Sequence, residues 1–295
     1  MSLIEQLTAF YWWHHTFNPW WGCVKIDNEE FGSGCDHCYA ESYAKLRAPE
    51  NVWGPHAPRR FLSENHWKQP LKWNRDAQAA AVRRNVFCAS MGDVFEQRPD
   101  LIAHRMRLLE LIRATPHLNW LIPTKRPQNI KRLLPAGYEN PRNLWIGTTV
   151  EHQHAADTRI PYLLDCNDVA QLFLSCEPLL GRIDIRQYLQ PNEHGKKIDW
   201  VIVGGESGGK SRAMRPMWAK SLIRQCEDAG TPVFFKQWGD YVPTSRVEHE
   251  GGNRKVVKFY KKNGDVISMT RVGTKNAGYE ILGQTFKQFP KRQPR

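Results

Sequence analysis

The chain has 295 residues, enough for one large α/β barrel or for two smaller domains. Its mean hydropathy of -0.60 and the lack of an apolar run long enough to cross a bilayer argue against a membrane protein. The net charge of +12 favours polyanionic partners such as DNA or RNA, although it does not bear on the fold.

The first residues and the cysteine content indicate a compartment. Residues 1–6 lack the basic start and the apolar stretch of a signal peptide, so we expect a cytoplasmic protein. The chain has seven cysteines, three of which lie between positions 23 and 38. Because the cytoplasm keeps thiols reduced, clustered cysteines there indicate a metal site or catalysis before disulfides.

Short apolar runs recur along the chain, and each ends in a polar residue that leads into a loop. Near-continuous apolar runs of this length are typical of parallel strands that are covered on both faces. We predict strands at 85–90, 118–123, 143–147, 171–175, 200–203 and 232–235, and a first strand near 9–17.

Helical stretches separate these runs. One is expected at 100–114, and another at about 217–229, where Gly230 suits the position after a helix end. The apolar face of the first would consist of Leu101, Ile102, Leu108, Leu109, Leu111 and Ile112.

Alternating strands and helices predict βα units with right-handed crossovers. The fold class is therefore α/β, as a full or partial TIM-type (β/α) barrel, with a doubly wound open sheet as the alternative. We favour the barrel because each predicted strand ends in a polar or charged residue, and the C-terminal rim of a barrel carries the chemistry. A single one of these residues could equally cap a helix or pair with a neighbour, but together they indicate an active rim: Asp93, Lys125, Arg126, Glu151, Glu177, Glu206 and Lys236.

The C-terminal region differs in character from the rest of the chain. Two alternating runs, 255–260 and 266–269, flank Asn263-Gly264, which predicts a β-hairpin. We expect a barrel at 1–240 and a small, basic β appendage at 241–295. From Tyr241 onward there are 12 Lys and Arg against 4 Asp and Glu, which fits either a solvated tail or a surface that binds nucleic acid.

Cys23, Cys35 and Cys38 form the strongest local signal. Eleven residues separate the first two, and the pair Cys35 and Cys38 is spaced to reach one metal centre from a tight turn. Thiolates are soft ligands that select zinc or iron–sulfur clusters. Three cysteines without a fourth are expected where a [4Fe–4S] cluster keeps one iron open for the amino and carboxylate groups of S-adenosylmethionine. Structural zinc remains open if a histidine supplies the fourth ligand, the candidates being His37, His14 and His15.

The cysteines follow the first predicted strand and precede a helix that begins near Tyr39, so a cluster loop at 22–41 would lie on the active rim. Four of the 12 tryptophans are expected to crowd this loop and wall the site, namely Trp12, Trp13, Trp20 and Trp21. The remaining cysteines are expected to be buried thiols: Cys88, Cys166, Cys176 and Cys226.

Several motifs together resemble a phage- and prophage-associated, three-cysteine family related to radical S-adenosylmethionine enzymes and catalogued mostly as a domain of unknown function. The motifs are TFNPWWGC (16–23), GCDHCYAE (34–41), SMGDVF (90–95), TKRP (124–127), SCEPLLG (175–181), VIVGGESG (201–208) and FFKQWG (234–239). The resemblance implies the barrel, the cluster and S-adenosylmethionine rather than a particular substrate. Ordinary radical S-adenosylmethionine enzymes have a CxxxCxxC motif and an early Gly-Gly-Glu, whereas here Gly204-Gly205-Glu206 comes late, so we assign the contact with the methionine amino group to Asp93.

The remaining roles follow as hypotheses. Lys125 and Arg126 would pair with the methionine carboxylate or a substrate phosphate, and Glu151 would hold the ribose hydroxyls. Tyr39 and Ser90 would also line the cofactor site. The residues expected to face the substrate are Glu177, Glu206 and Lys236.

We expect a nucleic-acid base or nucleotide as substrate, modified or repaired, with a reductant protein as electron donor. Two other classes remain open. One is a zinc-stabilised nucleic-acid-binding protein without catalysis. The other is a magnesium-dependent hydrolase built on the acidic rim residues Asp93, Glu151, Glu177 and Glu206.

Overall fold

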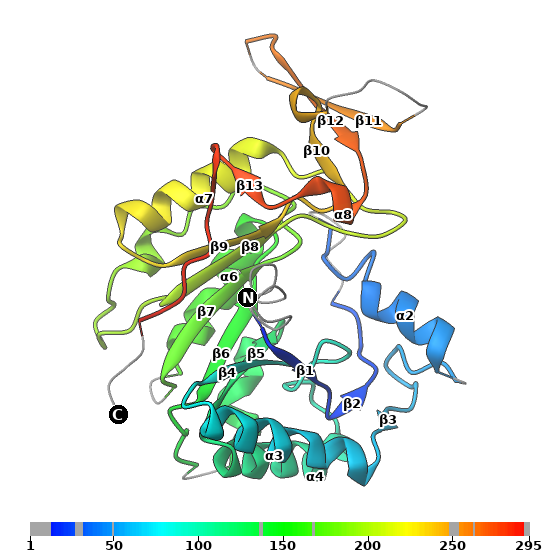
Figure 1. Ribbon diagram of the computed structural model, residues 1–295, viewed down its shortest axis with the longest axis vertical. Helices are drawn as coiled ribbons and strands as arrows, with labels where there is room; N and C mark the ends of the chain where they lie inside the picture. The colour runs from blue at the N-terminus through cyan, green and yellow to red at the C-terminus, as the bar shows by residue number, and fades with distance from the viewer. Residues whose placement is uncertain are drawn as a thin grey trace.

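A seven-stranded parallel sheet forms the centre of the computed structural model, which describes residues 13–26, 32–48, 50–135, 138–166, 169–247, 254–261 and 263–291 (Figure 1). The strand order is β1-β4-β5-β6-β7-β8-β9, so each strand pairs with the next one of the sheet along the chain. The bounds are β1 (His15–Phe17), β4 (Arg84–Cys88), β5 (Leu118–Thr124), β6 (Leu144–Thr149), β7 (Gln171–Cys176), β8 (Trp200–Gly204) and β9 (Val233–Gln237).

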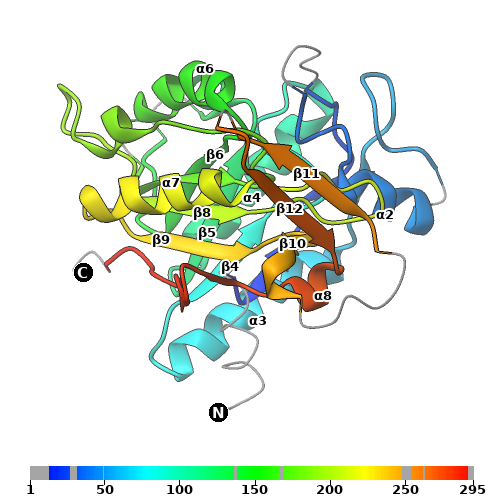
Figure 2. The same ribbon diagram turned by 90° about the horizontal axis from the view of Figure 1, so that it is seen from above.

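This order confirms the predicted α/β fold in its partial form. A doubly wound sheet reverses its strand order at a switch point, whereas here the order runs through the sheet without reversal, and the sheet curls into a half-barrel with β1 and β9 at its edges (Figures 1 and 2). The alternative of a doubly wound open sheet is therefore wrong. The first strand covers only His15–Phe17 of the expected 9–17, and residues 9–12 lie outside the described part of the chain.

Helices lie along the outer side of the curved sheet (Figures 1 and 2). The predicted helix at 100–114 is present as η1 (Pro99–Leu101) followed by α4 (Ile102–Ala114), and the one near 217–229 is α7 (Pro216–Asp228). Gly230 follows α7 with a φ of 64°, a conformation that glycine adopts readily. The other helices are α2 (Tyr39–Arg47), α3 (Glu64–Ala79), η2 (Pro127–Asn129), α5 (Ile130–Leu133), α6 (Gln153–Leu164), η3 (Arg186–Leu189), η4 (Thr244–Arg246) and α8 (Thr274–Ala277).

Alternating side chains of the strands build two separate cores. One set, which includes Val86, Ile122 and Leu172, packs against the helices. The next residue along each of these strands points to the opposite face, because side chains alternate along a strand. There the inner core is rich in aromatic residues: Phe87, Leu121, Trp145, Phe173, Trp200, Ile202 and Phe234, joined by Trp13. Burying each large apolar side chain of these cores stabilises the fold by about 1.5–3 kcal/mol.

The predicted hairpin is confirmed as β11 (Val256–Tyr260) and β12 (Val266–Arg271), which pair antiparallel. A third strand, β10 (Tyr241–Pro243), joins β12 on its other side. The chain then forms the short pair β13 (Glu280–Ile281) and β14 (Gln284–Thr285) and returns to the half-barrel, where the backbone N–H of Phe235 donates to the carbonyl oxygen of Phe286 at 2.8 Å. This contact covers the edge of β9, which would otherwise expose unpaired backbone groups. The division into domains at residue 240 remains a prediction.

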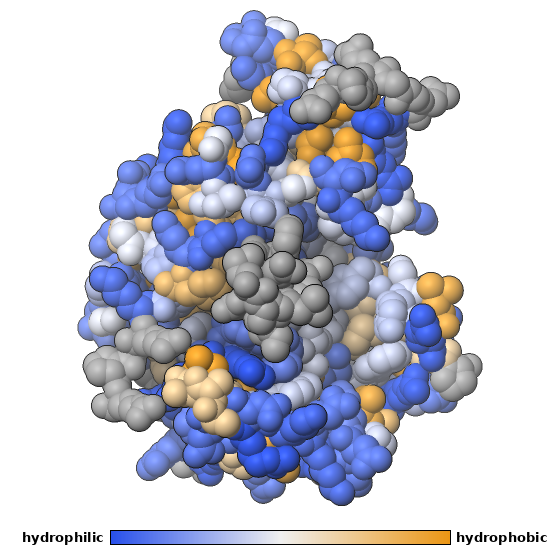
Figure 3. Space-filling view, in the orientation of Figure 1, coloured by the Kyte–Doolittle hydropathy of each residue, from blue (hydrophilic) through white to orange (hydrophobic). Residues whose placement is uncertain are grey.

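The surface is largely hydrophilic on the face seen in Figure 3, where hydrophobic surface is confined to small separate patches. Within the described residues, none of the helices combines the length and the apolar character needed to span a bilayer.

Candidate functional site

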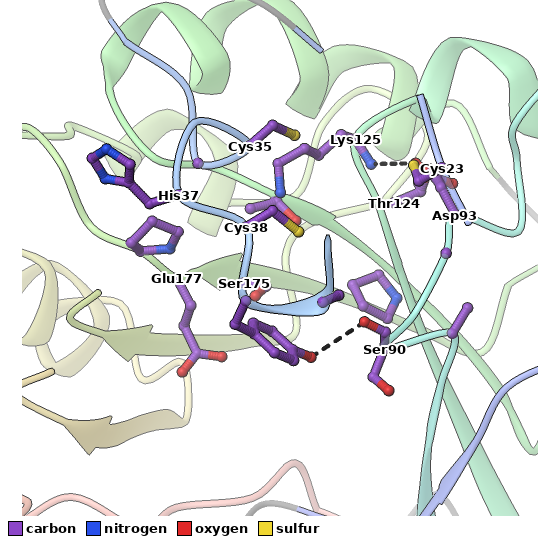
Figure 4. A pocket seen from close by; sticks show the side chains of 18 of the residues that line it. Cys23, Cys35, His37, Cys38, Ser90, Asp93, Thr124, Lys125, Ser175 and Glu177 are labelled. Atoms are coloured by element: carbon purple, nitrogen blue, oxygen red, sulfur yellow. Dashed lines mark hydrogen bonds between the residues drawn. The ribbon is translucent and has the colours of Figure 1, made fainter. Parts of the chain in front are cut away.

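A pocket of about 260 Å³ lies among the C-terminal ends of the parallel strands, the cysteine segments and the first residues of α2 (Figure 4). Every site residue predicted from the sequence lines this pocket except Glu151. The strand ends supply Ser90 and Asp93 after β4, Lys125 and Arg126 after β5, Glu177 after β7, Glu206 after β8, and Lys236 on β9, while Cys23, Cys35, Cys38 and Tyr39 come from the segments around α2.

The three clustered cysteines differ from the others in exposure. Cys23, Cys35 and Cys38 are partly exposed, and their thiols project into the pocket (Figure 4). The other four cysteines are buried, and burial raises the pKa of Cys166 to about 11 and that of Cys226 to about 12. These two therefore stay protonated and unreactive near neutral pH.

Two short segments carry the three cysteines, and ion pairs hold them together. Cys23 follows β2 (Trp20–Trp21), which pairs with β3 (Arg60–Phe61). The cysteine loop, residues 32–38, leads into α2, with Cys38 at the N-cap. Two residues after Cys23, Lys25 pairs with Glu41 of α2 at 2.7 Å. This pair brings the Cys23 segment to the helix that carries Cys38.

Arg212 anchors the cysteine loop to the end of β8. Its guanidinium donates to Glu206 Oε1 at 2.6 Å, to the carbonyl oxygen of Ser33 at 2.8 Å and to Asp36 Oδ2 at 3.0 Å. His37 Nδ1 lies 3.4 Å from the other oxygen of Glu206. Glu206, which was expected to face the substrate, thus also holds the loop through Arg212. Arg212 was not among the predicted site residues, and only its place shortly after the Gly-Gly-Glu motif could have indicated it.

Gly34 allows the cysteine loop to approach the strand ends closely. A Cβ atom at this position would lie 2.8 Å from Glu151 Oε1 and 3.0 Å from Pro178 Cδ. Glu151 itself has no exposed surface and pairs with Arg159 at 2.6 Å and with Lys125 at 3.6 Å. Burial raises its pKa, but the two cations outweigh burial and the net shift is downward, so the carboxylate stays charged.

Lys125 links this buried carboxylate to the thiols. Burial lowers the pKa of Lys125, but the charges of Glu151, Cys35 and Cys38 outweigh that effect, and the pKa lies above its usual value. Lys125 is therefore a cation close to two of the three sulfur atoms.

Arg126 occupies the equivalent place beside Cys23. Its Nη1 lies 2.9 Å from Asp93 Oδ2 and 3.7 Å from Cys23 Sγ, and its Nη2 donates to the carbonyl oxygen of Val24 at 2.6 Å. Burial, with a smaller effect of Asp93, raises the pKa of the free Cys23 thiol to about 12. Asp93 also accepts from the Thr124 hydroxyl at 2.7 Å. The predicted contacts of Asp93 and Arg126 with a methionine remain predictions, and in the structure the two side chains bind each other.

The other predicted residues close the pocket. Lys236 pairs with Glu177 at 3.2 Å and lies over the ring of Trp13, and the Tyr39 hydroxyl donates to the carbonyl oxygen of Ser90 at 3.3 Å. Of the four expected tryptophans, Trp12 lies outside the described residues, Trp20 is fully buried, and Trp21 packs against Tyr43 of α2. Trp53, which was not among the predicted residues, lines the pocket instead.

Three thiols make up the donor set, which suits an iron–sulfur cluster or, with a fourth ligand, zinc. Among the described residues, no three His, Cys, Asp or Glu side chains are arranged to hold one metal ion. In a cluster each thiolate binds its own iron, so the sulfur atoms need not converge on one point. Soft thiolates select zinc or iron–sulfur clusters, and Lys25, Lys125 and Arg126 would offset the negative charge of a cluster.

The alternative metals find less support in the contacts. The four acidic rim residues proposed for magnesium are each engaged by a cation: Asp93 by Arg126, Glu151 by Arg159, Glu177 by Lys236 and Glu206 by Arg212. Of the histidines considered for zinc, His14 accepts from the backbone N–H of Asn85, and His15 stacks on Trp73 of α3. Neither lines the pocket, whereas the third candidate, His37, does, and zinc with His37 as its fourth ligand remains a prediction.

Comparison with known proteins gives a family but no function. A family model described as a protein of unknown function, DUF5131, matches residues 7–290. No curated protein matches the chain. Among solved structures, the chain is similar to a mutant of spore photoproduct lyase, with 16% identity and a TM-score of 0.43, over 88% of this chain and 68% of that one.

Proposed function

The chain belongs to the DUF5131 family of proteins of unknown function, and we propose that it is an enzyme that holds a [4Fe–4S] cluster through Cys23, Cys35 and Cys38 and uses it to cleave S-adenosylmethionine. The observation that carries this proposal is that the three partly exposed thiols share one pocket at the strand ends, with cations beside them. The resemblance to the three-cysteine relatives of radical S-adenosylmethionine enzymes supports the same assignment.

When bound, the cluster would supply the electron that cleaves S-adenosylmethionine reductively. The protein's own residues fix and shield that site. Arg126 and Arg212 each tie one cysteine-bearing segment to the rim, through Asp93 and Glu206 respectively. Because metal ligands must be deprotonated, the neighbouring cations Lys125 and Arg126 favour the thiolate forms of the cysteines.

Lys125 is the residue we assign to the carboxylate of S-adenosylmethionine. It lines the pocket and forms an ion pair with the buried carboxylate of Glu151. Glu151 has no exposed surface, so a contact with ribose hydroxyls would require it to move, and we propose that it positions Lys125 instead. Tyr39, Ser90 and Asp93 would complete the cofactor side of the pocket. Lys236, Glu177 and Glu206 line it further along the sheet, where a substrate would lie.

We propose a nucleic-acid base or nucleotide as the substrate, and a separate reductant protein as the electron donor. The support for the substrate is the net charge of +12, concentrated in the C-terminal region. A polyanion would be drawn to such a protein, and the pocket would act on one base or nucleotide.

Metal analysis after anaerobic reconstitution with iron and sulfide tests the cluster. The wild-type protein should bind iron and sulfide in equal amounts and turn brown, and Cys23→Ala, Cys35→Ala and Cys38→Ala should each lose the colour. Cys166→Ala, which changes a buried cysteine away from the pocket, is the matched control and should retain it. Tightly bound zinc with no uptake of iron would overturn the proposal and favour a zinc-stabilised binding protein.

A further inference from the structure

A trough separates α7 from the appended sheet, away from the cysteine pocket. Two hollows of about 470 Å³ and 520 Å³ lie here, and they share Met217, Lys220, Lys261 and Ile267. We call this continuous surface the α7–β11 trough. Figure 2 shows β11 and β12 beside the end of α7 at which the helix begins. Within the described residues, none that lines the trough also lines the cysteine pocket.

The trough is strongly basic. Six cationic side chains line its first hollow against two acidic ones, Asp184 and Asp228. Two of the six cations are neutralised, since Arg186 pairs with Asp184 and Lys261 with Asp265. The others form no ion pair in the described part of the chain: Arg182, Arg215, Lys220 and Arg224.

Helix geometry places two of these free cations together. Lys220 and Arg224 are four residues apart on α7, and positions spaced by four lie on the same face of a helix. Arg182 comes from the segment before η3 and Arg215 from the N-cap of α7. All four cations line this one hollow of the trough.

Aromatic rings accompany these charges. The guanidinium of Arg215 lies 4.5 Å from the ring centre of Phe259 and 5.6 Å from that of Trp218. Its Nε is buried and has no hydrogen-bond partner among the described residues. Tyr260, the next residue along β11, also lines this hollow and is 69% exposed. Cations and an exposed aromatic residue that line one hollow are the combination that binds the backbone and the bases of an unpaired strand.

We propose that the α7–β11 trough binds single-stranded nucleic acid, with phosphates at Arg182, Lys220 and Arg224 and a base stacked on Tyr260. The free cations match the charge of phosphates, and the exposed ring favours an unpaired strand because paired bases have no free face for it. This inference rests on the proposed function, because it names single-stranded nucleic acid as the substrate of the proposed enzyme. The trough would hold the strand outside the pocket in which one base reacts.

Fluorescence anisotropy with a labelled oligothymidylate tests the trough without any cofactor. The variant Lys220→Glu/Arg224→Glu should raise Kd at least tenfold. It should also reduce the slope of log Kd against log salt by about 1.4, the value for two phosphate contacts of a single strand. The matched control is Lys68→Glu/Lys72→Glu, which reverses two exposed charges at the same spacing on α3 and changes the net charge equally. Its Kd should stay within about twofold of the wild-type value.

A second variant tests the base contact. Tyr260→Ala should raise the Kd for the single strand by about 5- to 150-fold, the range expected for loss of one stacked base. The same substitution should leave the weaker binding of a matched duplex unchanged. Labelled oligouridylate, measured alongside, shows whether the strand is DNA or RNA.

If the trough and control variants lose the same affinity for the oligonucleotide, or if both keep the wild-type affinity, the proposal that the trough binds the strand is wrong. Loss of duplex binding equal to that of the single strand in Tyr260→Ala would also overturn the stacking contact. Failure of the cluster to assemble would leave these binding results intact, so the two proposals fail separately.

Discussion

Arg126 Nη1 lies 2.9 Å from Asp93 Oδ2, and through this pair the segment that carries Cys23 is fixed to the end of β4. The same guanidinium bonds the carbonyl oxygen of Val24. Both side chains are largely buried, with 12% and 7% exposure. An exposed ion pair would contribute little to the stability of the fold. Here the loss of one partner leaves the other as an unpaired buried charge.

Arg126→Gln should therefore lower the free energy of unfolding by about 3 kcal/mol, because Asp93 is left without its cation. Urea denaturation of the protein measures this loss. The double variant Asp93→Asn/Arg126→Gln should recover at least about 1 kcal/mol, since the stranded charge is gone. Strictly additive losses in the two single variants and the double variant would show that the pair is not coupled.

Arg212→Gln should weaken retention of the cluster by about tenfold, the usual effect of removing a contact that orients a metal ligand. The substitution breaks the contacts of Arg212 with Ser33 and Asp36 in the cysteine loop. The rate at which a chelator removes iron from the reconstituted protein measures it. Arg246→Gln is the control, because it breaks an exposed pair with Glu280 elsewhere. Identical rates for the two variants would contradict a role of Arg212 in the loop.

Gly34→Ala should cost about 1–3 kcal/mol of stability and reduce iron binding, because the added Cβ overpacks the contact with Glu151. Glu151 is held by Arg159 and Lys125, so its carboxylate has little room to shift. Gly209→Ala is the matched control, since a Cβ there would meet no atom within 4 Å. Thermal unfolding and iron content of both variants check this, and an unaffected Gly34→Ala protein would show that the loop is not packed as described.

The stability of the protein should depend on pH through Lys287. Burial lowers its pKa from 10.5 to about 8, with Glu177 acting in the opposite direction and Lys236 in the same one. The unfolded chain therefore binds this proton more tightly than the folded chain. The free energy of unfolding of the wild type, relative to Lys287→Met, should rise as the pH increases from about 8 to about 10.5 and be level below that window. Denaturation series at both ends of the window measure the difference, and a difference that falls with pH would contradict the assignment.

The strands and the rim could be predicted from the sequence because both depend on local patterns. A strand such as β7, buried along its whole length, appears as a continuous apolar run, and Glu177 follows directly after it. The hairpin of β11 and β12 was likewise predictable from Asn263-Gly264. Eleven of the predicted site residues meet in one pocket, and seven of them do so because parallel strands end at the same edge of the sheet.

The features of the fold and the site that could not be predicted depend on contacts between residues far apart in the sequence. Arg212 bonds Asp36, which lies 176 positions away, and no local pattern connects the two. Helix α3 buries only Trp67, Pro70 and Ala77, and Pro70 within it weakens the helical pattern. Ile102 was expected on the apolar face of its helix, but it is 55% exposed, because it occupies the first turn of α4, where the chain enters from η1.

The proposed cleavage of S-adenosylmethionine is tested by the amount of 5′-deoxyadenosine formed when the anaerobically reconstituted and reduced protein is incubated with S-adenosylmethionine. We expect the wild type and Cys166→Ala to form it, and Cys23→Ala, Cys35→Ala and Cys38→Ala to form none. A protein that binds its full complement of iron yet forms no 5′-deoxyadenosine, with or without nucleic acid, would contradict the proposed chemistry.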